Sequence, residues 1–118
     1  MASNLQGRES RAMTTFDKRE EAFEKKFVID EELRFKAVAR RNRMLGMWAA
    51  EKLGKSGDDA NDYAKTVVAA EIDGGDPGVI RKVMTDLAAA GSSVTETEIA
   101  AKMDEWLAAA IAQVKAGK

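Results

Sequence analysis

Hydrophobic positions recur along the chain at intervals of three and four residues, the spacing of one helix face, in five stretches. The first stretch, residues 14–27, is charged and carries three phenylalanines on one face, which are Phe16, Phe23 and Phe27. Thr14 and Thr15 are candidate N-caps, because a threonine oxygen can accept a hydrogen bond from a free amide of the first turn. A narrow stripe interrupted by Glu20 predicts a segment that is helical only in part.

Four further stretches have broader apolar faces and predict helices that share a core. The first of them extends from Asp30 to Leu53, and Gly54 is placed to end it. Asp58 or Asp59 is the expected cap of the next helix. Two positions inside the first apolar stripe, Arg40 and Arg41, are expected to lay their stems along apolar surface and to reach water or acids. The expected core positions are Leu33, Ala37, Met44, Leu45, Trp48, Ala49, Leu53, Tyr63, Ala64, Val67, Val68, Ile72, Val79, Ile80, Val83, Met84, Leu87, Ile99, Met103, Trp106, Leu107, Ala110, Ile111 and Val114.

Breakers separate the last three of these helices. Residues 73–78 read DGGDPG, and Asp76 as N-cap with Pro77 at the first helical position predicts that a new helix begins there. Gly91 ends that helix, and Thr95 with Glu98 fits a capping box for the last one. The sequence therefore predicts an all-α four-helix bundle, preceded by a mobile, partly helical N-terminal segment.

This pattern divides the chain into three regions: residues 1–12 as a disordered leader or expression remnant, residues 13–28 as the N-terminal segment, and residues 29–118 as the bundle. Residues 14–53 form either one helix or two. Val28 and Ile29 lower helix propensity slightly, so we favour a bend near residues 28–30. The three phenylalanines could pack on the bundle or bind another protein, and periodicity does not decide between these alternatives.

Composition narrows the function classes. The 118 residues include no cysteine and no histidine, which excludes disulfides and zinc–thiolate sites and removes the commonest general base. A binding or regulatory protein is favoured over an enzyme, and we assign no catalytic residue and no metal site. No apolar run approaches the roughly 18 residues of a membrane span, and residues 1–12 lack the hydrophobic stretch of a secretory signal.

Charge is unevenly distributed behind a net value of −1. Residues 33–55 carry seven bases and one acid, whereas residues 56–118 carry eleven acids and six bases. A basic stretch can bind nucleic acid, but Arg40 and Arg43 point away from the stripe that Arg34 and Arg41 share. Ion pairing within the chain or with another protein is therefore favoured, and nucleic-acid binding is ranked last.

Two motifs have ordinary explanations. LGKSG, residues 53–57, suggests a phosphate-binding loop, but Ala49 occupies the first glycine position and the preceding residues are expected to be helical. A helix C-cap followed by a polar loop explains the same residues. The acids at 58–62 and 73–76 do not fit a twelve-residue calcium loop, so capping is the better interpretation.

Longer segments resemble a known family. MTTFDKREEAFEKKF and DEELRFKAVARRNRMLGMWAAEKLG, within residues 13–54, resemble the start of the zeta subunit of alphaproteobacterial F-type ATP synthases. IRKVMTDLAAAG and IAAKMDEWL resemble its later segments, so the similarity extends from Met13 to about Leu107. The resemblance implies a four-helix bundle with a mobile inhibitory segment.

The same resemblance implies a function without catalysis. The segment from Met13 to about Phe27 would insert between a catalytic alpha/beta interface and the gamma rotor stalk, and so block ATP hydrolysis. The expected partners are thus the alpha, beta and gamma subunits. The residues expected to contact them are Thr14, Thr15, Phe16, Lys18, Arg19, Phe23, Lys25, Lys26 and Phe27, with the aromatic rings as anchors and the bases facing acidic groups.

Further expectations follow from the resemblance. No cofactor is required, although some members bind ATP or ADP, and a small nucleotide-sensing helical module is the alternative function. No motif places such a nucleotide site. We expect a monomer when free, without nucleic-acid binding or membrane insertion, in the bacterial cytoplasm and peripheral on the inner membrane through the synthase.

Overall fold

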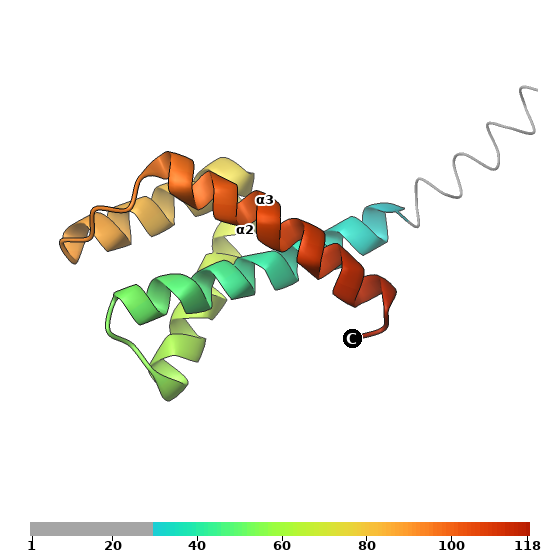
Figure 1. Cartoon of the computed structure of the whole chain (residues 1–118), viewed down its shortest axis with the longest axis horizontal. Coiled ribbons are helices and arrows are strands. Elements are labelled where there is room, and N and C mark those ends of the chain that lie inside the picture. Colours follow the sequence, from blue (N-terminus) through green and yellow to red (C-terminus); the bar gives the residue numbers. More distant parts are fainter. Residues whose placement is uncertain (1–29) are drawn as a thin grey trace, which may run out of the picture. The chain divides into compact units, whose positions relative to one another are not determined.

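The structure is a computed structural model that describes residues 30–118 (Figure 1). Residues 33–118 form one compact unit, and we call them the body. The described residues hold three helices: residues 30–52, which we call the first helix, α2 (Gly57–Ala89) and α3 (Glu96–Lys115). The predicted all-α class is confirmed for this part of the chain. None of these three helices is long and apolar enough to cross a membrane.

The predicted four-helix bundle is wrong in its helix count. The two helices expected on either side of DGGDPG are one element, α2, in whose interior Gly75 leaves helical geometry, with φ 63° and ψ −161°. Glycine tolerates these angles because it has no Cβ, and Pro77 removes one helical amide just beyond the kink. The chain therefore bends at a single residue and continues as helix, giving an N-terminal arm (57–74) and a C-terminal arm (76–89).

Helix ends follow the predicted chemistry at three of four positions. Gly54 (φ 78°) ends the first helix and Gly91 (φ 81°) follows α2, each with a backbone hydrogen bond to an earlier carbonyl. The Thr95 hydroxyl accepts from the Glu98 N–H at 3.1 Å, as the capping box requires at its threonine. The predicted cap at Asp58 or Asp59 is wrong. The N-cap is Ser56, because Gly57 with φ 55° already begins the helix and both acids fall in its first turn.

All three helices contribute to one hydrophobic core. Leu45, Val67, Val83 and Ile99 are fully buried, and each such side chain stabilises the fold by about 1.5–3 kcal/mol relative to its exposed state. Figure 1 shows α3 running alongside both the first helix and the C-terminal arm of α2. One expected core residue is misplaced: Ile72 is 81% exposed, because it lies on the face of the N-terminal arm opposite Val67. Trp48 and Trp106 pack against the core while remaining partly exposed.

Candidate functional site

The residues predicted to contact the ATPase lie outside the described residues. These are Thr14, Thr15, Phe16, Lys18, Arg19, Phe23, Lys25, Lys26 and Phe27. The predicted bend near residues 28–30 also falls largely outside that range. Within the body, two groups of side chains carry chemistry of their own: a charged cluster and an aromatic face.

A charged cluster lies beside the kink of α2. Arg41 of the first helix is only 2% exposed, and its guanidinium donates to carboxylates on both arms of α2. Nη2 lies 3.2 Å from Glu71 Oε1 and 2.7 Å from Asp76 Oδ1, and Nη1 lies 3.4 Å from Asp76 Oδ2. One guanidinium thus connects residues on either side of Gly75. We call Arg41, Asn42, Glu71 and Asp76 the Arg41 cluster.

Asn42 completes the cluster and is fully buried. Its Nδ2 donates to Glu71 Oε1 at 2.8 Å, and its Oδ1 accepts from Arg41 Nε at 3.0 Å. Among residues 30–118 no buried side-chain nitrogen or oxygen lacks a hydrogen-bond partner. Full pairing of this kind is what allows an arginine to remain buried, since an unpaired charge would be strongly destabilising.

The two carboxyl groups of the cluster are shifted in opposite directions. Burial raises the pKa of Glu71 above its ordinary value, and the nearby Asp76 carboxylate adds to that rise. The hydrogen bonds from Arg41 lower the pKa of Asp76, and Arg34 contributes a weaker attraction. A neutral Glu71 beside an ionised Asp76 is therefore the first state reached on acidification.

Sequence reasoning found half of this cluster. It predicted that Arg41 would reach water or acids, but it assigned Asp76 to helix capping, whereas the side-chain hydrogen bonds of that carboxylate come from Arg41. Glu71 and Asn42 were missed. An arginine inside an apolar stripe was the available signal, and only tertiary structure reveals which acids it meets.

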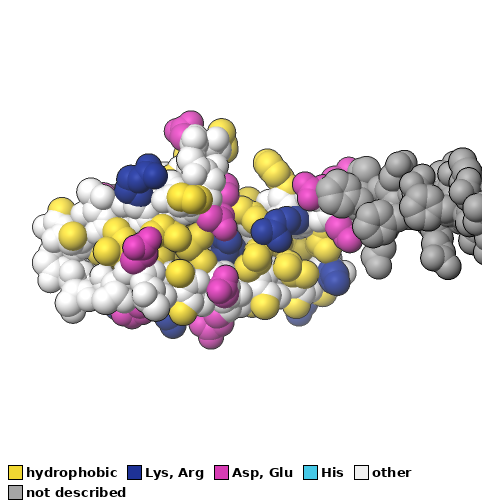
Figure 2. Space-filling view, turned by 90° about the horizontal axis from the view of Figure 1, so that it is seen from above, with side chains coloured by type: hydrophobic (Ala, Val, Ile, Leu, Met, Phe, Trp, Pro, Cys, Tyr) yellow, Lys and Arg dark blue, Asp and Glu magenta, His cyan; other side chains and the backbone are white. Residues whose placement is uncertain are grey.

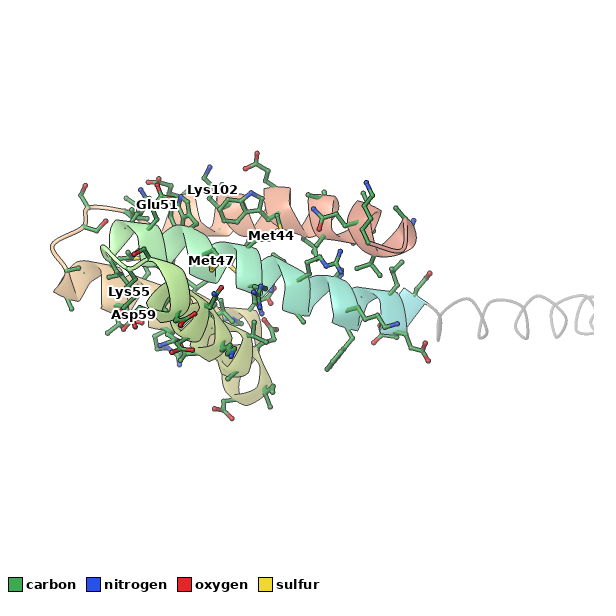
Figure 3. All side chains as sticks on the ribbon, turned by 90° about the horizontal axis from the view of Figure 1, so that it is seen from below. Met44, Met47, Glu51, Lys55, Asp59 and Lys102 are labelled. Carbon is green, nitrogen blue, oxygen red and sulfur yellow. The ribbon has the colours of Figure 1, made fainter. Side chains whose placement is uncertain are left out.

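An aromatic and cationic face joins the first helix to α3. The rings of Trp48 and Trp106 meet edge to face, with centroids 6.0 Å apart. Lys52 Nζ lies 4.9 Å from the Trp48 ring and Lys102 Nζ lies 5.4 Å from the Trp106 ring. Figure 3 shows Met44, Glu51 and Lys102 along this junction. We call Trp48, Lys52, Lys102 and Trp106 the tryptophan face.

Of the three large apolar side chains exposed in residues 30–118, which are Phe35, Met47 and Ile72, two are exposed over most of their surface. Phe35 is 77% exposed and Ile72 is 81% exposed. Figure 2 shows hydrophobic side chains at the surface between charged groups on one face of the body. No group of three or more acidic residues in the described range is arranged to hold a metal ion.

Comparisons with known proteins give a family. The sequence matches the family model described as ATPase inhibitor subunit zeta over residues 13–113. One similar structure, determined by solution NMR, has 44% sequence identity and a TM-score of 0.63, and the match covers 73% of this chain and 99% of that chain. No curated protein matches this chain significantly. Since the family match extends over most of the sequence, the chain belongs to the ATPase inhibitor subunit zeta family.

Proposed function

We propose that this protein inhibits ATP hydrolysis by an F-type ATP synthase through its N-terminal segment, which inserts into a catalytic alpha/beta interface beside the gamma stalk. The observation that carries the proposal is the family match over residues 13–113, which includes the segment as well as the body. Inhibition by insertion requires a fitting surface and no catalytic group, which agrees with a chain that has neither histidine nor cysteine.

The body supplies a scaffold for such an inhibitor. Among residues 30–118 the buried hydrophobic side chains lie between Ala37 and Ala110 and come from all three helices. A folded body that contacts the synthase raises the local concentration of an attached segment, and this increases apparent affinity without new contacts in the catalytic interface.

The N-terminal segment has the composition of a peptide that folds on binding. Phe16, Phe23 and Phe27 have the spacing of one helix face and would enter apolar pockets, while Lys18, Arg19, Lys25 and Lys26 would face acidic groups of the partner. Part of the binding free energy would then be spent on ordering the segment. The alpha, beta and gamma subunits are the proposed partners, at the cytoplasmic face of the inner membrane.

The test is ATP hydrolysis by an alphaproteobacterial F-type ATPase that lacks its own zeta subunit. The enzyme is titrated with the full chain, with a chain that starts at Asp30, and with a full chain carrying Phe16→Ser, Phe23→Ser and Phe27→Ser. Only the full wild-type chain should inhibit, and circular dichroism should show the same folded body in all three. A chain starting at Asp30 that inhibits as strongly as the full chain would refute the role of the segment.

A second candidate, nucleotide binding, is favoured by the tryptophan face. Indole rings can stack on a nucleotide base and lysine ammonium groups can pair with phosphate, and Trp48, Trp106, Lys52 and Lys102 place both kinds of group together. In this function ATP or ADP would adjust the body without being hydrolysed.

Intrinsic fluorescence tests this candidate directly, because Trp48 and Trp106 are the two tryptophans of the chain. Titration with ATP or ADP should change the emission, and Lys52→Gln with Lys102→Gln should weaken binding at least several-fold. Lys65→Gln is the matched control, since Lys65 is exposed on α2. Absence of any nucleotide-dependent change in emission or in amide chemical shifts would exclude this function and would leave the inhibitor proposal standing.

A further inference from the structure

The kink of α2 has the geometry of a hinge. Gly75, with φ 63° and ψ −161°, is the one residue inside α2 with non-helical angles, so the relative direction of the two arms depends on a single pair of dihedral angles. A helix hydrogen-bonded through this point would be stiff, but glycine offers little resistance to changes in either angle. Whatever fixes the angle between the arms must therefore come from contacts across the kink.

The Arg41 cluster supplies such contacts. Glu71 lies four residues before Gly75 and Asp76 lies one residue after it, and both carboxylates accept from the same nitrogen, Arg41 Nη2. The Arg41 side chain is 2% exposed, against 26% for Glu71 and 46% for Asp76. The guanidinium is therefore fixed inside the body, while the two carboxylates on the arms are reached by water and by protons.

The charged groups that act on the two carboxylates belong to the first helix and to α2. From the first helix these are Arg41, with Asn42 as a neutral donor, and Arg34, which attracts Asp76. From α2 they are Glu71 and Asp76 themselves, whose carboxylates both accept from Arg41 Nη2 and whose mutual interaction raises the pKa of Glu71. No charged group of α3 contributes to the pKa shift of either carboxyl. Two carboxylates that share one arginine nitrogen repel each other when both are ionised, and a single proton between them converts that repulsion into a hydrogen bond.

We propose that Glu71 and Asp76 bind one proton between them and that this proton draws the two arms of α2 together across Gly75, which makes the kink a proton-sensitive hinge. With the proton bound, Glu71 donates to the Asp76 carboxylate while Arg41 remains paired with Asp76. When the proton leaves, two negative charges face each other across the hinge and the arms move more freely. Stronger acid then protonates Asp76 as well and weakens its pairing with Arg41.

The direction in which pH changes folding stability follows from the opposite pKa shifts of Glu71 and Asp76. Because the pKa of Glu71 is raised by burial, the folded protein takes up this proton before the unfolded chain does. The free energy of unfolding therefore rises as pH falls through the folded-state pKa of Glu71. At lower pH it falls again, because the ionised Asp76 carboxylate, whose pKa is lowered by Arg41, stabilises the fold only until it is protonated. The hinge is tightest between these two events.

The experiment measures the angle between the arms in the full chain. Lys65 and Thr85 are exposed, one on each arm, and the chain has no native cysteine, so Lys65→Cys with Thr85→Cys gives two defined spin-label sites. Electron–electron distances are recorded at pH 8 and pH 5. In the doubly labelled chain without further substitution, the distribution of distances between the two spin labels should be narrower at pH 5 than at pH 8. With Glu71→Gln, a neutral isostere that can donate to Asp76, it should be narrow at both pH values.

Asp73→Asn is the matched control, because Asp73 is an exposed acid two residues from Glu71 and should leave the pH response intact. Carboxyl-carbon NMR of the otherwise wild-type chain gives an independent measurement that does not depend on any variant folding. Glu71 should titrate above the ordinary range of glutamate. An unchanged distance distribution between the two pH values, or a Glu71 carboxyl that titrates normally, would overturn the proposal. Neither measurement involves the ATPase, so failure of the hinge proposal can be distinguished from failure of the proposed inhibitory function.

Discussion

Gly46 of the first helix packs directly on the backbone of Ala64 in α2. A Cβ added at Gly46 would lie 2.6 Å from the Ala64 Cα and 3.0 Å from its Cβ. Contacts of a Cβ at 2.6 Å are essentially never seen, and the Ala64 Cα is a backbone atom that cannot turn aside, so the two helices cross at a separation that favours glycine. Glycine costs about 1 kcal/mol relative to alanine inside an ordinary helix. At this position close packing offsets that cost.

Gly46→Ala should therefore destabilise the body, because the gain in helix propensity is smaller than the cost of separating the two helices. We expect a net loss of about 1–3 kcal/mol in the free energy of unfolding, typical of overpacked cores. Urea denaturation followed by circular dichroism measures it. A variant at least as stable as the wild type would show that the crossing can widen at little cost.

Gly75 and Gly74 provide a matched pair at the kink. Gly75→Ala should cost about 1–3 kcal/mol, because its φ of 63° with ψ of −161° belongs almost exclusively to glycine. Gly74 does not have a positive φ and has nothing within 4 Å of an added Cβ, so Gly74→Ala should be neutral or slightly stabilising. Thermal unfolding of both variants checks the difference. Equal losses of stability in Gly75→Ala and Gly74→Ala would mean that Gly75 is not held at these φ and ψ angles.

Arg41→Lys tests the geometry of the Arg41 cluster. A lysine has one nitrogen and cannot donate to both Asp76 oxygens and to Asn42, so we expect a loss of about 1–2 kcal/mol, reduced by the partial exposure of Asp76. Arg43→Lys, at an exposed position two residues along the helix, is the control and should change stability by less than about 0.5 kcal/mol. Chemical denaturation at pH 7 compares the two variants, and similar losses in the free energy of unfolding would contradict a specific role for the Arg41 guanidinium.

Tyr63 should make stability depend on pH in the alkaline range. Its hydroxyl donates to Asp86 Oδ2 at 2.8 Å, which also accepts from Lys82, and burial followed by this bond raises the pKa of the phenol. The unfolded chain loses the tyrosine proton near pH 10, before the folded protein does. The stabilisation is therefore complete below about pH 10 and declines as pH rises further.

Tyr63→Phe should cost about 1 kcal/mol at pH 7 and should remove this alkaline decline. The wild-type titration can be followed by absorbance at 295 nm, because Tyr63 is the one tyrosine of the chain. If the gap in unfolding free energy between wild type and variant stays constant from pH 9 to pH 11.5, the hydrogen bond does not control the ionisation.

Thr95→Ala should weaken the start of α3. The threonine oxygen accepts from the Glu98 N–H, and loss of an N-cap of this kind costs about 1 kcal/mol. Thr97 lies in the first turn without a capping role, so Thr97→Ala should be neutral or slightly stabilising through helix propensity. Hydrogen exchange of the first amides of α3 distinguishes local fraying from a global effect, and unchanged exchange in Thr95→Ala would contradict the cap.

Much of the fold was predictable because its signals are local. Helical periodicity identified the three helices of residues 30–118, and glycine at Gly54 and Gly91 marked the ends of two of them. The helix count was wrong because DGGDPG contains the residues of a helix start, yet one glycine suffices to bend α2 without ending it. Ile72 fits an apolar spacing, four residues after Val68, but lies on the face of the arm opposite Val67, because successive steps of four residues drift away from the buried face.

The candidate sites were harder to predict, for a physical reason. Arg41 and its acid partners are separated by 30 and 35 residues, so no local pattern connects them. The Trp48 and Trp106 pair likewise joins residues far apart in sequence. The proposed inhibitory contacts around Phe16, Phe23 and Phe27 involve residues outside the described range, and their assignment remains a prediction from family resemblance.

The kink of α2 also has a consequence for how the body assembles. Arg41 contacts residues on both sides of the kink from another helix, 35 positions before Asp76, so a peptide comprising only residues 57–89 would lack these contacts and should lack a defined bend. During folding the two arms can form early, since helices depend on nearby residues, but their mutual direction must wait until the first helix docks. The shape of α2 is thus acquired late and belongs to the assembled body.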